Sequence, residues 1–339
     1  MRTRRRFLAD TAAIAGGLAF GALMPHPARA EGTVRIAEQY GIGYLIFHVA
    51  RDRKLIEKHG KDAGLDVTVE WVKLSGGSAM NDALLSGAID LGAAGVGPLL
   101  TIWDRTRGRG DVKGIAALGN MPLYLNTRNP DVTSIRDLTE KDRIALPSVG
   151  VSIQSRTLQM AAAAAFGDDK FDVLDKYTVT LPHPDAVVAM LSGKTEINGH
   201  FTSPPFQYQE LEDPAIRRIL SSYEVLGGPA TFNAVWTTSR FREDNPKTYA
   251  AILKAFGEAV EIINADKAAA AETYLRVENS KLDPAFVRRI VEDPEVAYTL
   301  TPQKTEAYAA FMHKVGAIKA APASFRDYFF DDVHALPGS

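Results

Sequence analysis

Two glycine- and serine-rich turns hold the residues best suited to binding a small molecule. Ser75-Gly76-Gly77-Ser78 and the stretch 147–152 each stand between an expected strand and an expected helix. Backbone N–H groups at a helix start are free, the helix dipole favours an anion there, and glycine lets a ligand approach closely. Helix capping explains either turn alone, and two turns at equivalent places make binding an equal alternative. The candidate contacts are Ser75, Gly76, Gly77, Ser78, Ser148, Val149, Gly150, Val151 and Ser152.

Three further segments could complete the walls of such a site. The glycine-rich run 92–98 follows an expected strand, and a tight strand–helix connection explains it equally well. Tyr40 flanks a glycine turn, and the run 200–202 combines an aromatic ring with a hydroxyl. His183 stands between two prolines, where a surface histidine is the plainer explanation. The additional candidate contacts are Gln39, Tyr40, Gly95, Val96, Gly97, His183, His200, Phe201 and Thr202.

Signatures of catalysis and of metal binding are missing from the sequence. It contains no GxxxxGK[ST], no GxSxG and no HExxH, and its seven histidines show no HxH spacing. Gly41-x-Gly43 resembles the start of a dinucleotide fingerprint, but Ile46 occupies the third glycine position. Because there is no cysteine, disulfides, thiolate nucleophiles and cysteine-bound metals are excluded. We therefore expect a binding protein with no catalytic residue, no metal and no cofactor.

Residues 1–30 have the pattern of an export signal. Arg4-Arg5-Arg6-Phe7-Leu8 precedes a short apolar stretch, and Ala28-Arg29-Ala30 offers a small-residue cleavage site. The paired arginines resemble a twin-arginine signal, which exports folded proteins. A retained membrane anchor is the alternative, although the apolar stretch is short for a span. We expect cleavage after about Ala30 and a periplasmic protein.

The net charge argues against a nucleic-acid partner. Five arginines and one aspartate lie within residues 1–30, so the remainder carries 34 basic and 40 acidic residues, a net charge of −6. A chain this acidic, with no basic tract after residue 30, is a poor candidate for binding nucleic-acid phosphates. No later segment has the length and apolarity of a membrane span. We expect no nucleic-acid partner and no membrane span after signal removal.

Strands and helices alternate along the chain in two successive series. Alternation of this kind is typical of parallel sheets covered by helices. The first series has expected strands at 34–37, 66–72, 89–92 and 114–118 and helices at 44–59, 79–86 and 96–106. The second has strands at 143–146, 177–181 and 196–199 and helices at 152–166 and 185–191. A strand at 232–237 then returns the chain towards the first series, and helices follow at 249–264, 266–276, 284–292 and 302–316.

The order of these motifs resembles a known family. The run Leu84 to Gly95, followed by Pro98, is similar to the helix–strand–loop signature of the nitrate/sulfonate/taurine class of periplasmic solute-binding proteins. The segment 181–193 resembles its second-lobe counterpart, and Ser134-Ile135-Arg136-Asp137-Leu138 resembles its S-x-x-D-L motif. The match covers residues 33–330, and the order of motifs is more specific than any single motif.

The resemblance implies an α/β type II periplasmic-binding fold with two doubly wound lobes and a central cleft. Residues 31–122 and 225–339 would form lobe 1 with the C-terminal helices, and residues 123–224 would form lobe 2. It also implies a monomeric extracytoplasmic protein, not an enzyme. Such a protein delivers a small, anionic organic ligand, such as a sulfonate, a taurine-like compound or a carboxylate, to an ABC permease and its ATPase.

Two departures from the family pattern leave the ligand class open. The second-lobe strand ends Glu196-Ile197-Asn198-Gly199, and the stretch 200–205 replaces the family's W-x-P. The alternative reading is a pyrimidine-precursor synthase-like enzyme or a pyrimidine-binding protein of the same fold. That enzyme group needs a bound cofactor, or a consumed histidine and several cysteines. This chain has no cysteine, and the export signal does not fit such an enzyme. A sensory module that hands its ligand to a receptor is the third reading.

Overall fold

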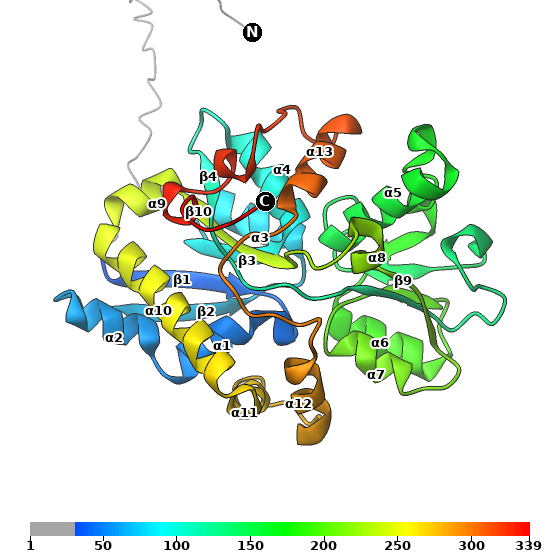
Figure 1. The fold of residues 1–339 in the computed structure, drawn as a ribbon, viewed down its shortest axis with the longest axis horizontal. Coiled ribbons are helices and arrows are strands. Elements are labelled where there is room, and N and C mark those ends of the chain that lie inside the picture. The colour runs from blue at the N-terminus through cyan, green and yellow to red at the C-terminus, as the bar shows by residue number, and fades with distance from the viewer. Residues whose placement is uncertain (1–30) are drawn as a thin grey trace, which may run out of the picture. The chain divides into compact units, whose positions relative to one another are not determined.

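Two five-stranded sheets, each covered by helices, organise the protein (Figure 1). The computed structural model describes residues 31–339, so the expected export signal lies outside the described residues. Within residues 31–339, every helix is too short or too polar to cross a membrane. We keep the names lobe 1 for residues 31–122 and 225–339 and lobe 2 for residues 123–224.

The two sheets share one plan, which confirms the predicted pair of doubly wound lobes. The strand orders are β2-β1-β3-β10-β4 and β7-β6-β8-β5-β9. The first sheet comprises β1 (Thr33–Glu38), β2 (Thr68–Lys73), β3 (Leu91–Gly95), β4 (Val112–Ala117) and β10 (Asn233–Thr238). The second comprises β5 (Tyr124–Thr127), β6 (Ile144–Leu146), β7 (Thr178–Thr180), β8 (Gly199–Phe201) and β9 (Arg217–Ser221). Each sheet has one inserted antiparallel strand, β10 or β5, and each inserted strand follows a crossing from the other lobe.

The helices divide between the lobes in the same way (Figure 1). Lobe 1 contains α1 (Leu45–Asp52), α2 (Leu55–Asp62), α3 (Gly77–Leu85), α4 (Val96–Thr106), α9 (Ser239–Asp244), α10 (Pro246–Ala265), α11 (Lys267–Val277), α12 (Pro284–Glu292) and α13 (Thr305–Lys314). Lobe 2 contains α5 (Ile153–Phe166), α6 (His183–Ser192), α7 (Phe206–Leu211) and α8 (Ser222–Leu226).

Small residues in β3 make room for large ones around it. The sequence of β3 is LGAAG, and every residue in it is buried. Trp236 of the neighbouring β10 is fully buried, and its indole lies beside Gly92 together with Met80 of α3. On the outer face, Phe256 of α10 stacks on Phe47 of α1 with ring centroids 5.1 Å apart. The sheet that carries the site is therefore fixed by packing on both faces.

Several sequence-based boundaries were wrong. The helix expected at 44–59 is two helices, because Lys54 between them adopts a left-handed conformation with φ 50°. The strand expected at 89–92 lies at Leu91–Gly95, so the supposed loop from Gly92 to Gly95 is strand. The strand expected at 196–199 lies at Gly199–Phe201, and β5 and β9 were not predicted.

The crossings between the lobes are held together at Asn120. This residue follows β4 and pairs as an isolated bridge with Thr231, which precedes β10, and with Ala297 on its other side. Its backbone N–H donates to the Ala297 carbonyl at 2.8 Å, and its side-chain oxygen accepts from the Thr231 hydroxyl at 3.3 Å. Its side-chain amide donates to Gln303. Because Asn120 is only 3% exposed, water cannot replace these bonds.

Replacing Asn120 with alanine is expected to lower the free energy of unfolding by about 1–3 kcal/mol, because buried partners lose their hydrogen bonds. Urea unfolding measured by circular dichroism checks this. Asn264→Ala is the control, since Asn264 is exposed and its side chain donates to the Tyr298 carbonyl. Equal costs for the two variants would show that Asn120 does not secure the crossings.

Candidate functional site

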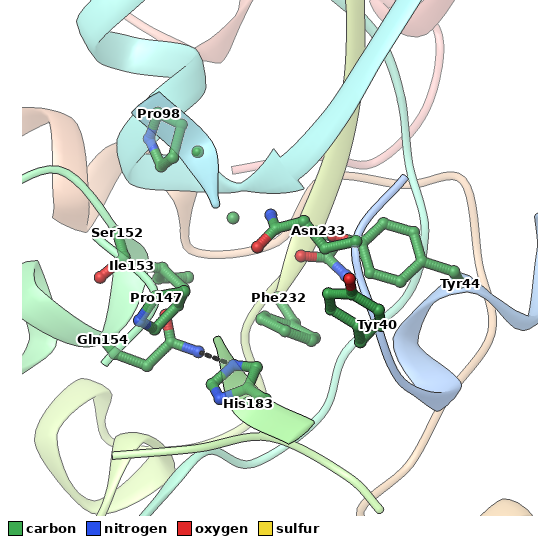
Figure 2. Close-up of a pocket in the computed structure, with 13 residues that line it drawn as sticks. Tyr40, Tyr44, Pro98, Pro147, Ser152, Ile153, Gln154, His183, Phe232 and Asn233 are labelled. Carbon is green, nitrogen blue, oxygen red and sulfur yellow. Dashed lines mark hydrogen bonds between the residues drawn. The ribbon is translucent and has the colours of Figure 1, made fainter. Parts of the chain in front are cut away.

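A small pocket lies where the carboxyl ends of strands from both sheets meet (Figure 2). Residues from both lobes line it: Gln39, Tyr40, Tyr44, Gly77, Gly95, Pro98, Pro147, Ser152, Ile153, Gln154, His183, Phe232 and Asn233. Its volume is about 10 Å³, which is room for a single water molecule. A larger ligand can therefore enter only if the lobes move apart.

Four helices begin at the pocket wall in this structure of residues 31–339. They are α3, α4, α5 and α6, and their first residues or N-caps, Gly77, Gly95, Ser152 and His183, all line it. None of the lining residues is Lys, Arg, Asp or Glu. Helix starts carry a partial positive charge, so the pocket offers an anion several dipoles without a formal positive charge.

The two lobes touch through the glycine turns of lobe 1. A Cβ placed on Gly76 would lie 2.4 Å from the Pro147 carbonyl oxygen and 2.5 Å from the Ser148 hydroxyl oxygen. A Cβ on Gly95 would lie 2.5 Å from a side-chain carbon of Ile153. Real Cβ atoms do not approach other atoms this closely, so only glycine permits this arrangement of the lobes.

Hydrogen bonds also join the lobes. The Ile42 backbone N–H donates to the Pro204 carbonyl at 3.1 Å, and the Ser78 backbone N–H lies 3.4 Å from the Ser148 hydroxyl oxygen. Gly41, which precedes the donor Ile42, has φ 105°, and a Cβ on it would lie 2.7 Å from the same Pro204 oxygen. The structure is therefore a closed arrangement, with lobe 1 turns seated on lobe 2 turns.

Lobe 1 presents uncharged polar groups to the pocket. The Tyr44 hydroxyl donates to the Ala93 carbonyl at 3.3 Å, and burial raises the pKa of this phenol, which keeps it neutral. The Asn233 amide nitrogen lies 3.5 Å from the Gly43 carbonyl, while its amide oxygen is buried without a hydrogen-bond partner in the described structure. That oxygen is free to accept a hydrogen bond from a ligand.

Lobe 2 presents a buried chain of polar side chains that ends at the pocket. Glu210 of α7 lies 2.5 Å from His200 Nδ1, and His200 Nε2 lies 2.9 Å from His183 Nδ1. His183 Nε2 lies 3.3 Å from Gln154 Nε2 at the pocket wall, a contact drawn in Figure 2. Burial, and then the neighbouring His200, hold the pKa of His183 well below its usual value. His183 is therefore neutral.

The pocket brings together part of the predicted site. Gln39, Tyr40, Gly77, Gly95, Ser152 and His183 line it. Gly76, Ser78, Gly97, Ser148 and Val151 lie at the contact between the lobes instead. His200, Phe201 and Thr202 are fully buried and do not line the pocket, because they belong to or directly follow β8 rather than a loop.

The remaining predicted residues lie elsewhere. Ser75 and Val149 are exposed, a Cβ on Gly150 would meet no atom within 4 Å, and Val96 is buried inside α4. Pro98 and Pro147 lie in segments predicted for the site but were not singled out as contacts. The pocket is also lined by residues that were not predicted: Tyr44, Ile153, Gln154, Phe232 and Asn233. The only sequence signal for Gln154 is its place two residues after the Ser152 cap, which puts it in the first turn of α5.

A charged cluster lies beside the pocket at the ends of β1 and β2. His48 Nε2 is 3.3 Å from Glu38 and 3.2 Å from Glu278, and these three residues could in principle hold a metal ion. The Lys73 ammonium, however, lies 3.0 Å from Glu38 and 2.8 Å from Glu278. The two carboxylates thus already have a cation between them. Although burial opposes it, the carboxylates raise the pKa of His48, so the cluster is a balanced ion-pair network.

The charged cluster around Glu278 predicts that the folded protein loses stability in acid. Burial alone would raise the pKa of Glu278, but His48 and Lys73 lower it from 4.5 to about 2. A lowered folded-state pKa contributes stability that is present above pH 4.5 and lost as pH falls towards 2, by at most about 3 kcal/mol. Glu278→Gln should flatten the pH dependence of the unfolding free energy in that window. Glu261→Gln, at an exposed position on α10, should leave it unchanged.

Sequence comparison identifies the family. Residues 42–277 match the model of the NMT1-like family, which covers well over half of the chain. The chain belongs to the NMT1-like family. No protein of curated function matches the sequence of this NMT1-like chain.

Solved structures confirm the fold of this NMT1-like chain. The alkanesulfonate-binding protein SsuA from Xanthomonas axonopodis pv. citri, bound to MOPS, aligns with TM-score 0.66 and 19% identity, over 87% of this chain and 96% of that protein. The periplasmic nitrate-binding protein NrtA from Synechocystis PCC 6803 aligns with TM-score 0.68 and 16% identity, over 88% and 84%. The periplasmic aliphatic sulphonate-binding protein SsuA from Escherichia coli gives 0.63 and 16%, over 88% and 92%. The predicted periplasmic-binding fold is correct.

Proposed function

We propose that this NMT1-like chain is the solute-binding protein of an ABC importer and binds a small organic anion between its lobes. The observation that carries the proposal is the convergence of helix starts from both lobes on one pocket without a charged side chain. Dipoles of this kind stabilise an anion, and their N–H groups bind carboxylate or sulfonate oxygens. Proteins of this fold that bind alkanesulfonates and nitrate support an anionic ligand.

The mechanism is closure of the lobes on the ligand. An open form exposes the turn at Gly76 and the start of α5 at Ser152 to solvent. A ligand that contacts both lobes binds the closed form more tightly and shifts the population towards it. The glycine contacts at Gly76 and Gly95 then allow the lobes to approach each other around the ligand. The membrane permease recognises the closed protein.

The cellular setting follows from the same proposal. The expected signal at residues 1–30 places the protein in the periplasm, where a monomer delivers its ligand to the permease and ATPase. Residues 31–122 with 225–339 form one lobe and residues 123–224 the other, which the division of strands between the two sheets supports. We propose no catalytic step.

A neutral heterocycle such as a pyrimidine is the second candidate ligand. The amide side chains of Gln39, Gln154 and Asn233 line the pocket together with Tyr40 and Phe232. Amides pair with the edges of a heterocycle, and aromatic rings stack on its faces. The choice between the two ligand classes rests on whether the negative charge of the ligand contributes to binding.

A thermal-shift screen tests the proposal. The panel contains taurine, ethanesulfonate, MOPS, benzoate, nitrate, and pyrimidines with and without a phosphate. A specific ligand at 100 times its Kd stabilises the folded protein by about 2.7 kcal/mol. We expect sulfonates or carboxylates to raise Tm. If only neutral pyrimidines do so, the second candidate replaces the first, and if only phosphorylated compounds do so, both are wrong.

A further inference from the structure

The buried side chains of Glu210, His200 and His183 behind the pocket form a row of hydrogen bonds that donate in one direction. Glu210 is fully buried, and its two carboxylate oxygens are taken by His200 Nδ1 at 2.5 Å and by the Asn126 amide nitrogen at 2.8 Å. A carboxylate only accepts hydrogen bonds, so His200 Nδ1 carries a proton. The question is which of the two nitrogens between His200 and His183 carries the next one.

Charge balance answers this question. Within residues 31–339, His200 is the group that forms an ion pair with Glu210, and no Lys or Arg does so. A buried carboxylate without a cation is strongly unfavourable. With Glu210 as a carboxylate, charge balance makes His200 its cation, and His200 Nε2–H then donates to His183 Nδ1 across the 2.9 Å contact.

The position of the His200 proton then determines which nitrogen of His183 carries a proton at the pocket. His183 is neutral, so with Nδ1 accepting from His200 its remaining proton lies on Nε2. That nitrogen faces Gln154, whose amide accepts from it once its oxygen and nitrogen exchange places, an orientation that heavy-atom positions do not distinguish. His183 Nε2–H is thus a neutral donor at the pocket wall, which the Gln154 amide oxygen accepts in the ligand-free protein and which a ligand acceptor takes over once Gln154 turns away.

Other groups around His183 are compatible with its neutral form that carries the proton on Nε2. Phe206 of α7 stacks on the His183 ring at 5.6 Å, and Thr202 places its hydroxyl oxygen 3.4 Å from His183 Nδ1. Asp185, on the same helix, is exposed. From lobe 1 the phenol of Tyr40 lines the pocket, with the Lys73 ammonium 5.5 Å from its ring.

We propose that the buried Glu210–His200 ion pair holds His183 in its Nε2–H tautomer, and that this N–H is the side-chain donor with which lobe 2 selects a ligand carrying an acceptor, such as a sulfonate or carboxylate oxygen. This rests on the proposed function, because it assigns the ligand chemistry of the same pocket. Glu210 and His200 are positioning residues that do not touch the ligand. The arrangement supplies a donor while keeping formal charge out of the pocket.

Removing the Glu210–His200 ion pair is expected to move the proton of His183 from Nε2 to Nδ1. In Glu210→Gln, one acceptor oxygen replaces two: we expect it to accept from His200 Nδ1–H, while the new amide nitrogen faces Asn126, whose side-chain oxygen has no partner in the described structure. No carboxylate then holds the second proton on His200. His200 Nε2 then accepts from His183 Nδ1–H, and His183 Nε2 presents a lone pair to the pocket. An anion loses a donor and meets an acceptor, so its binding should weaken about 10- to 100-fold. Glu210→Asp keeps the charge and should retain the tautomer.

Nitrogen-15 NMR of the full chain, labelled at histidine, tests the tautomer directly, and His183→Gln assigns the signals. We expect His183 to carry its proton on Nε2 in the wild-type protein, with and without ethanesulfonate, and on Nδ1 in Glu210→Gln. Calorimetry with ethanesulfonate measures affinity. The control is Glu258→Gln, which removes the carboxylate 2.7 Å from His59 Nε2 at a partly exposed site outside the pocket and should change neither readout.

Two results overturn the inference. One is a wild-type His183 with its proton on Nδ1, and the other is a Glu210→Gln variant with an unchanged tautomer or unchanged affinity. If no anion binds the wild-type protein, the proposed function fails separately, and the NMR spectrum of the ligand-free protein still decides whether the ion pair sets the tautomer of His183.

Discussion

Valine at position 76 is expected to weaken ligand binding by more than about 100-fold, because it prevents the lobes from closing and so removes the contacts of one lobe. The added Cβ would lie 2.4 Å from the Pro147 carbonyl oxygen, which belongs to the backbone of the other lobe and cannot rotate away. Gly76 has an extended backbone, with φ −172° and ψ 169°, which valine adopts readily. Each lobe should therefore fold normally. Calorimetry with the best ligand of the panel measures the loss.

The control for this variant is Gly257→Val. Gly257 lies on α10, and a Cβ there would meet no atom within 4 Å, so closure should proceed as in the wild-type protein. Small-angle X-ray scattering with saturating ligand supplies an independent readout, since Gly76→Val should keep the larger radius of the open form. Wild-type affinity in Gly76→Val would mean that the ligand-bound protein is not closed at this turn.

The turns at helix starts were predictable because their signal is local. Glycine and serine between a strand and a helix indicate a cap and a free helix start wherever the sheet lies. Parallel topology then places these turns at the carboxyl edge of a sheet. Ser152 confirms the local part of this reasoning, because its hydroxyl caps α5 by accepting from the Ser155 N–H at 3.2 Å.

The residues that were missed depend on pairing between distant segments. Asn233 lies at the pocket because β10 runs antiparallel to β3 and pairs Asn233 with Gly95. Nothing near residue 233 in the sequence specifies this register, and the same is true of Phe232, which precedes the strand. Pro147 reaches the pocket by meeting Gly76 across the gap between the lobes.

The boundary error at β8 had the largest consequence for the site. Placing the strand at 196–199 made His200 a loop residue and a direct ligand contact. In the structure His200 lies within the strand, fully buried behind His183. Its role is understood only once Glu210 on α7 and His183 on α6 are placed against it by the fold.

Aspartate at position 152 is expected to weaken the binding of an anion about 100-fold while the protein remains folded. Aspartate caps a helix as well as serine does, so the start of α5 should be preserved. Its carboxylate would stand at the pocket wall, where Ser152 is 3% exposed and lines the cavity. Two negative charges ~5 Å apart repel by about 3 kcal/mol at an effective dielectric constant of 20, or about 100-fold in Kd.

Ser152→Asn separates the charge of this variant from its size. Asparagine has nearly the shape of aspartate and is an equally good N-cap, so the two variants fill the same space and differ by one charge. If the ligand is an anion, calorimetry should give a Kd about 100-fold weaker for Ser152→Asp than for Ser152→Asn. If the two variants bind equally, the charge of the ligand does not contribute, and the neutral heterocycle becomes the better account of the pocket.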